Sequence, residues 1–205
     1  PPLIAVPTTA GTGSEVTLAA VITDDKTHYK YPINDFVLIP RFAVYDPEFT
    51  RGLPASITGQ TGMDALTHAV EAFIGRSTTP YTRKMARQAV QLIHDYLLEA
   101  YEHGDNEEAR IQMSLAALEA GIAFNNSSVT IVHGMSRPIG ALFHIAHGLS
   151  NAVLLEVCMN YVKDGALDRF ADLARYCGMT QNENDALAAD LFLETFDIMA
   201  DEFRG

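Results

Sequence analysis

Apolar positions in the first part of the chain form short runs that alternate with turn residues. These runs are rich in β-branched residues, and glycines, aspartates and prolines separate them, a pattern typical of β-strands joined by turns. We therefore expect strands within residues 1–46, carried by the apolar runs at 3–6, 16–22, 36–39 and 42–45.

From Pro54 onward the apolar residues recur every three or four positions, which is the spacing of an amphipathic helix. Glycines and polar clusters divide this part of the chain into segments of ordinary helix length, so we expect five to seven helices packed on one another. The last helix is predicted over about residues 185–203. Pro138 and Gly140 are expected to break the segment that contains them.

The composition is that of a folded protein, because 48% of the 205 residues are hydrophobic and only 20% are charged. The 14 Lys and Arg residues against 26 Asp and Glu residues give a net charge of −12 without any basic cluster, so nucleic acid is not expected as a partner. No apolar run approaches the roughly 18 residues that span a bilayer, and the first residues do not have the basic start and apolar middle of a secretory signal, so we expect none. We expect a cytoplasmic protein without a membrane partner, in which Cys158 and Cys177 are buried thiols.

Asp64 and His68 lie four residues apart in a predicted helix, so their side chains share one face and can reach a common point. Both sit in an otherwise apolar stretch, where an unpaired carboxylate would be costly. This spacing suits two ligands of one metal ion. A plain Asp–His salt bridge on a half-buried helix is the alternative that this helix alone leaves open.

His133 and His147 are each followed directly by a glycine, and a small residue beside a ligand allows close approach by backbone or by a cofactor. One carboxylate and three imidazoles would hold a divalent cation and leave room for a substrate oxygen. Hydrogen bonding within a core is the alternative for each histidine taken singly. His144, between Phe143 and Ile145, has a setting more typical of a packed histidine.

Residues 7–17, PTTAGTGSEVT, join two strand-like runs through two glycines and several hydroxyl residues. Such a turn presents N–H and hydroxyl groups that can bind phosphate or ribose. It is neither a dinucleotide-binding Gly-rich motif nor a P-loop, so taken alone this segment is more typical of an ordinary hairpin.

Three long motifs follow one another in register: PTTAGTGSEVT, TGMDALTHAVEAF and VHGMSRPIGALFHIAHG. With the intervening LIPRFAVYDPEFTRGLP, they make the chain closely resemble the iron-containing (group III) alcohol dehydrogenase family, over residues 1 to at least 161. The resemblance implies an incomplete form of the dehydroquinate synthase-like two-domain plan. Residues 1–46 would be the last strands of a nucleotide-binding α/β domain, and residues 47–205 an all-helical metal-binding domain, truncated at its C-terminus.

The resemblance also implies roles for individual residues. The family's nucleotide-contacting turn falls on Thr8, Thr9 and Thr12, and Lys30 falls where a lysine reaches the cofactor ribose. Phe124 falls in the wall of the substrate pocket. The implied metal ligands are Asp64, His68, His133 and His147.

The implied activity is hydride transfer between NAD or NADP and a small alcohol or its aldehyde or ketone, in an enzyme that is expected to form a homo-oligomer. Iron(II) is the metal that the family implies, although residue types alone accept Zn²⁺ equally. The alternatives are a zinc polyol dehydrogenase of the glycerol type and a non-catalytic metal-binding helical module.

The chain departs from the family pattern in two respects. Arg137 stands where the family often has a second histidine, so it cannot relay a proton, and His144 becomes the candidate for that catalytic role. Arg137 could instead bind an acidic or hydroxylated substrate, or form a structural ion pair. In addition, no Gly-rich pyrophosphate loop precedes Pro1, so we expect a piece of a longer enzyme that binds metal but turns over alcohols poorly by itself.

Overall fold

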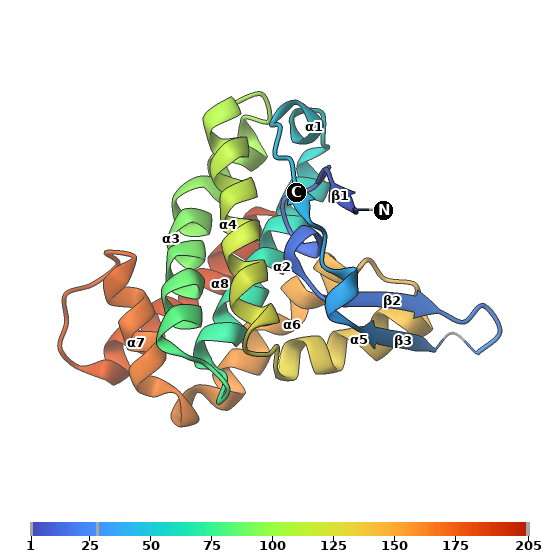
Figure 1. Ribbon diagram of the computed structural model, residues 1–205. Helices are drawn as coiled ribbons and strands as arrows, with labels where there is room; N and C mark the ends of the chain where they lie inside the picture. The colour runs from blue at the N-terminus through green and yellow to red at the C-terminus, as the bar shows by residue number, and fades with distance from the viewer. Residues whose placement is uncertain (1, 28, 204–205) are drawn as a thin grey trace.

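The computed structural model describes residues 2–27 and 29–203, and Figure 1 shows a bundle of helices with a β-hairpin projecting from one side. The predicted domains, residues 1–46 and 47–205, include residues 1, 28, 204 and 205. These four residues lie outside the described residues. Strands come first and helices follow, which confirms the predicted class: a small sheet remnant followed by an all-helical part. A domain boundary between residues 46 and 47 stays a prediction.

The strands form two separate pairs. Strand β1 (Ile4–Ala5) pairs in parallel with β4 (Phe42–Ala43), and β2 (Ala19–Thr23) pairs antiparallel with β3 (Lys30–Asn34), with Val21 opposite Pro32. Apolar side chains along these strands are exposed, and the described residues of this part form no closed sheet.

One predicted strand, at 36–39, is wrong, and the strand predicted at 16–22 is wrong in part. Residues 36–38 form the 3-10 turn η2 (Phe36–Leu38), because the Asp35 carboxylate accepts a hydrogen bond from the Val37 N–H and caps the turn. The run predicted at 16–22 begins with a second 3-10 turn, η1 (Ser14–Val16), so that the strand starts only at Ala19. Local hydrogen bonds here override the β-propensity of the apolar residues.

A short helix, α1 (Glu48–Arg51), precedes seven longer ones, which agrees with the five to seven expected after Pro54 within the described residues. Asn184 caps the last helix, which ends at Glu202, within a residue of the prediction. The seven helices are α2 (Ala55–Ile74), α3 (Pro80–Glu102), α4 (Glu107–Asn125), α5 (Ile131–Phe143), α6 (His147–Val162), α7 (Leu167–Tyr176) and α8 (Asp185–Glu202).

Helix α2 is the central element of the bundle. It packs against α3, α4 and α6, and almost every residue from Gly62 to Ile74 is buried. Figure 1 shows α3 and α4 side by side over α2, with α5 lying near the β2–β3 hairpin. Polar side chains on α2 therefore have to find partners inside the protein.

Pro138 does not break its segment, contrary to the expectation from sequence, because α5 continues through it to Phe143. A proline has no N–H to donate to the carbonyl four residues earlier, here that of Gly134. Helix α5 is also held by its packing against α6 and β3. The chain still separates His133 from His147, since a new helix begins at His147.

In the described part of the chain, no helix combines the length and the apolar character needed to cross a membrane. Cys158 and Cys177 are free and buried, as predicted.

The start of α6 touches the backbone of α2. A Cβ atom on Gly148 would lie 2.3 Å from the carbonyl oxygen of Gln60, closer than any real contact, so only glycine fits. Gly134, the other glycine that directly follows a histidine, leaves open space around the position that a Cβ would take, with no described atom from outside its own stretch of helix backbone within 4 Å. Close backbone approach, predicted for both glycines, is therefore found only at Gly148.

Gly148→Ala is expected to destabilise the protein by about 1–3 kcal/mol, because either α6 or α2 must move away from the contact. The matched control is Gly134→Ala, which is expected to leave the stability unchanged or to raise it by up to about 1 kcal/mol, since alanine favours a helix interior. Urea unfolding followed by circular dichroism measures both. Equal stability of the two variants would contradict the close approach.

Candidate metal and cofactor site

Asp64 and His68 project from the buried face of α2. Both side chains are almost inaccessible, and the Asp64 Oδ1 atom lies 4.0 Å from His68 Nδ1, as the i,i+4 spacing predicts. The acid–histidine pair is thus present, but it is only one part of a larger polar cluster.

His133 comes from the first turn of α5 and His147 from the first residue of α6. Their Nε2 atoms lie 3.7 and 3.6 Å from Asp64 Oδ1. One ligand atom from each of these three residues lies within 4.8 Å of the other two, which is the arrangement of a metal-binding group. Three helices thus bring to one point side chains that are up to 83 positions apart in the sequence.

His68 lies beside this group of three. Its ring stacks on the ring of His133, with centroids 4.4 Å apart, and on the other side it stacks on Phe124, at 4.2 Å. Its Nδ1 atom is buried and has no hydrogen-bond partner among residues 2–27 and 29–203. An unsatisfied buried nitrogen costs free energy, and a cation would supply the partner that it lacks.

Asn151, one turn after His147 on α6, approaches the same point. Its amide nitrogen donates to Asp64 Oδ1 at 2.6 Å, and it lies 3.2 Å from His133 Nε2 and 3.3 Å from His147 Nε2. One NH₂ group has two protons for these three acceptors. A site with more acceptor lone pairs than protons fits a divalent cation, and the donor set of one carboxylate and imidazoles suits Fe²⁺ or Zn²⁺.

Glu71, also on α2, is fully buried. It contacts the Nδ1 side of the His133 ring, the side that faces away from Asp64. Its carboxylate accepts hydrogen bonds from Thr130 Oγ1 at 2.6 Å, from the Val132 N–H at 2.8 Å and from His133 Nδ1 at 2.5 Å. Nδ1 then carries the proton, so in the neutral ring the lone pair of Nε2 faces Asp64. A carboxylate behind a histidine in this way is a common support for metal ligands.

The pKa shifts in the cluster follow from burial and from the two carboxylates. Burial would lower the pKa of His133, but the hydrogen bonds and charges of Asp64 and Glu71 outweigh it and raise that pKa. Burial prevails at His68, where it lowers the pKa of the ring to about 4, and it also lowers the pKa of His147. The nearby imidazoles keep the pKa of Asp64 below its ordinary value despite burial. Asp64 is therefore ionised, and His68 and His147 are neutral, near pH 7.

The hydroxyl-rich turn is held against two helices. Gly13 has a left-handed backbone (φ 59°), and a Cβ there would lie 2.7 Å from the Cα of Gly121 on α4. A Cβ on Gly11 would lie 2.6 Å from the carbonyl oxygen of Thr61 on α2. The glycines of this turn are required by these two close contacts.

Thr12 of this turn lines a cavity of about 270 Å³ that also contains the histidine cluster. Lys30 of β3 and Phe124 of α4 line the same cavity. Thr8 and Thr9 precede Thr12 in the turn and do not line it.

His144 is the C-cap residue of α5, exposed and in the left-handed region with φ 55°. It is not among the described residues that line the cavity. A proton-transfer role for His144 stays a prediction, and its placement adds no support to it.

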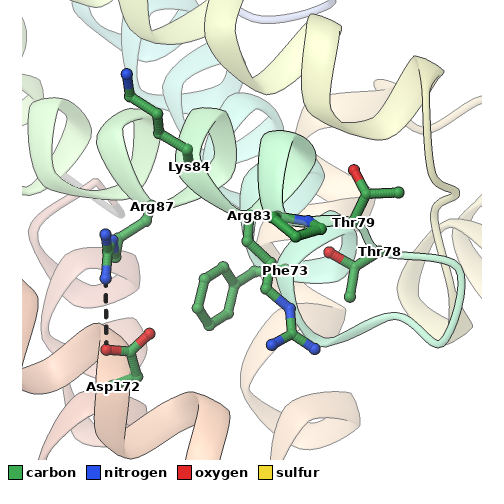
Figure 2. A pocket seen from close by; sticks show the side chains of 8 residues that line it. Phe73, Thr78, Thr79, Arg83, Lys84, Arg87 and Asp172 are labelled. Carbon is green, nitrogen blue, oxygen red and sulfur yellow. Dashed lines mark ion pairs between the residues drawn. The ribbon is translucent and has the colours of Figure 1, made fainter.

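A second hollow, of about 440 Å³, lies at the start of α3 and contains none of the clustered histidines. Figure 2 shows Arg87 directed toward Asp172, at 3.6 Å, while Lys84 points the opposite way. The Arg87 guanidinium also covers the ring of Tyr176, at 4.2 Å from its centroid. Arg87 is thus already engaged in structural contacts with Asp172 and Tyr176.

Sequence reasoning missed Glu71 and Asn151. A signal for both was present, because Glu71 follows Asp64 by seven residues and His68 by three, and Asn151 follows His147 by four. Each spacing places the residue on the same helix face as a candidate ligand.

Comparisons with known proteins show which family the chain is similar to. Residues 1–47 match the family described as "Iron-containing alcohol dehydrogenase". Residues 58–201 match the family described as "Fe-containing alcohol dehydrogenase family, C-terminal". The chain is 43% identical over 188 residues to an NADPH-dependent butanol dehydrogenase of Clostridium saccharobutylicum, a match that covers 92% of this chain and 48% of that protein. It is 44% identical over 178 residues to a 1,3-propanediol dehydrogenase of Citrobacter freundii, covering 87% and 46%.

A solved structure of a 1,3-propanediol oxidoreductase matches with a TM-score of 0.96 and 39% identity, over 100% of this chain and 54% of the other. The chain spans about half the length of the curated relatives that it matches.

In the metal-free protein, His133 is expected to carry its proton on Nδ1, and Glu71→Gln is expected to lower the pKa of the ring because the charge opposite Nδ1 is lost. Nitrogen-15 NMR of the histidine rings, recorded as a function of pH, measures both tautomer and pKa. Glu99→Gln is the matched control, since Glu99 accepts a hydrogen bond from Asn106 at 2.7 Å and belongs to a helix that supplies none of the clustered residues. An unchanged His133 titration in Glu71→Gln would contradict the proposed support.

Proposed function

Because this chain belongs to the iron-containing alcohol dehydrogenase family, we propose that the protein containing it transfers a hydride between NAD or NADP and a small alcohol, or its aldehyde or ketone. The single observation that carries the proposal is the convergence of Asp64, His133 and His147 from three helices on one point. Because the chain spans about half of its relatives, the activity proposed is that of the complete protein.

We assign Fe²⁺ to Asp64, His68, His133 and His147. The ionised Asp64 supplies the negative charge, and the imidazoles supply neutral nitrogen lone pairs. Zn²⁺ fits the same donor set, so the choice of iron rests on the family and not on the ligands. When bound, the ion supplies Lewis-acid stabilisation of the negative charge that develops on the substrate oxygen.

The chain's own residues do the positioning. Glu71 fixes the tautomer and the orientation of His133 through three hydrogen bonds. Phe124 stacks on His68 and forms an apolar wall that keeps water from that side of the cavity. Thr12 and Lys30 line the cavity on the side of the hydroxyl-rich turn, where we place the cofactor.

The alternatives are less well supported. A non-catalytic metal-binding module would not need Thr12 and Lys30 in the same cavity as the histidines. A zinc polyol dehydrogenase would use a similar cavity, and the metal content of the purified protein separates it from the iron enzyme. We further propose that the complete protein forms homo-oligomers, as expected from the resemblance to the family.

Asp64→Asn and His147→Ala are each expected to lower metal content and to reduce NADH or NADPH formation from 1-butanol at least about 100-fold, because several kcal/mol of charge stabilisation is lost. The assay uses the natural full-length protein that contains these 205 residues, and metal is measured by elemental analysis. The control is His94→Ala, a partly exposed histidine paired with Asp95 at 3.0 Å. Full activity of the metal-free variants would refute the assignment.

The affinity for Fe²⁺ or Zn²⁺ is expected to rise with pH and to level off above the raised pKa of His133. Below that pKa both ring nitrogens carry protons, so the metal must displace the proton on Nε2. His68 contributes little to this dependence above about pH 5, because its pKa is about 4 and the ring is already neutral. Chelator competition with Zn²⁺ between about pH 5 and pH 8 measures the effect. A pH-independent affinity would exclude His133 as a ligand.

A further inference from the structure

Two cationic side chains, Lys30 and Arg137, line the cavity that holds the histidine cluster. Asp64 is the only acidic residue among the described residues that line it, and its carboxylate is engaged by Asn151 and the histidines. The chain as a whole carries a net charge of −12, so two cations in one small cavity are not a consequence of general basicity. A cavity with positive walls concentrates anions.

Arg137 lies one helical turn after His133 on α5, so the two side chains share a face of that helix. The guanidinium is exposed to the cavity and has no hydrogen bond or ion pair with any residue in 2–27 or 29–203. Its charge contributes to the lowered pKa of His147. The structural ion pair that the sequence left open for Arg137 is therefore not present in the described residues.

Lys30 approaches the same helix from the β2–β3 hairpin. Its Nζ atom lies 3.6 Å from the position that a Cβ on Gly140 would take, so the ammonium rests against α5 one turn beyond Arg137. In the proposed function Lys30 faces the cofactor. Arg137 is the other cation that lines the cavity, and it follows the candidate ligand His133 on α5. It is therefore the cation that is available to bind the substrate.

Building on the proposed hydride transfer, we propose that Arg137 binds an oxyanion of the substrate, so that this enzyme prefers short aldehydes and alcohols that carry a carboxylate or a similar small anionic group. The planar guanidinium offers two parallel N–H groups that match a carboxylate. The cavity of about 270 Å³ admits a short chain only, and Phe124 and Val21 provide apolar contacts for its methylene groups.

An anion could also come from the dinucleotide, whose phosphates have the same chemistry. The experiment therefore measures kcat/KM of the natural full-length, metal-loaded protein for 4-oxobutanoate and for pentanal, a neutral aldehyde of similar length. Each is measured with NADH and with NADPH. The variant is Arg137→Gln, and the matched control is Arg83→Gln, an exposed arginine of α3 that lines the other hollow.

The wild type and Arg83→Gln are expected to prefer 4-oxobutanoate over pentanal by at least tenfold. In Arg137→Gln, this preference is expected to fall roughly 10- to 100-fold, the usual range for a lost hydrogen bond to a charged group. An unchanged preference in Arg137→Gln overturns the proposal. A change in the NADPH-to-NADH ratio without a change in the aldehyde preference also overturns it, because Arg137 would then bind the cofactor.

Binding of butanoate, measured by calorimetry, separates this proposal from the proposed function. Arg137→Gln is expected to bind butanoate at least tenfold more weakly than the wild type and Arg83→Gln. If the wild type reduces neither aldehyde with either cofactor, the proposed function fails, while weaker binding in Arg137→Gln still supports an oxyanion site. Equal binding in all three proteins overturns the oxyanion site, whatever the activity.

Discussion

The buried carboxylate of Asp64 is the constraint on which the rest of the site depends. A charge in the middle of a helix bundle is stable only if the surrounding groups compensate it. Here the compensation comes from three helices at once: an amide from α6 and imidazoles from α2, α5 and α6 surround one oxygen. The groups that surround it are mainly acceptors, however, and acceptors around an anion leave lone pairs unmatched. A cation at the centre of this group would match these lone pairs.

A second buried carboxylate, Glu71, connects this site to the backbone. By accepting from the Thr130 hydroxyl and the Val132 N–H, it fixes the first turn of α5 to α2, and it orients His133 at the same time. The start of a helix has N–H groups without partners, and a carboxylate there is favoured both by hydrogen bonding and by the helix dipole. The fold and the site are therefore not separable at this point, since the group that caps α5 also selects the tautomer of a candidate ligand.

The cavity beside the cluster shows how an acidic protein can present a local positive surface. Lys30 arrives from the hairpin and Arg137 from α5, two elements in contact with each other. Glycines make this closeness feasible: Gly13 and Gly121 bring the hydroxyl-rich turn onto α4, and Gly148 brings α6 onto the backbone of α2. Side chains at these positions would move the walls of the cavity apart. The chemistry of the cavity thus rests on a few backbone contacts as much as on its charged groups.

The sequence by itself determined the order of strands and helices, the end of α8 near residue 203, and the shared face of Asp64 and His68, because these follow from local periodicity. It also singled out His133 and His147 by their glycine neighbours. Only the tertiary structure decided that these histidines meet Asp64, that Asn151 and Glu71 join them, and that α5 runs through Pro138. It also decided that Phe124 and Lys30 face the cluster while His144 lies outside the cavity lining. Local spacing fixes which residues share a helix face, whereas packing between helices distant in sequence fixes which faces meet.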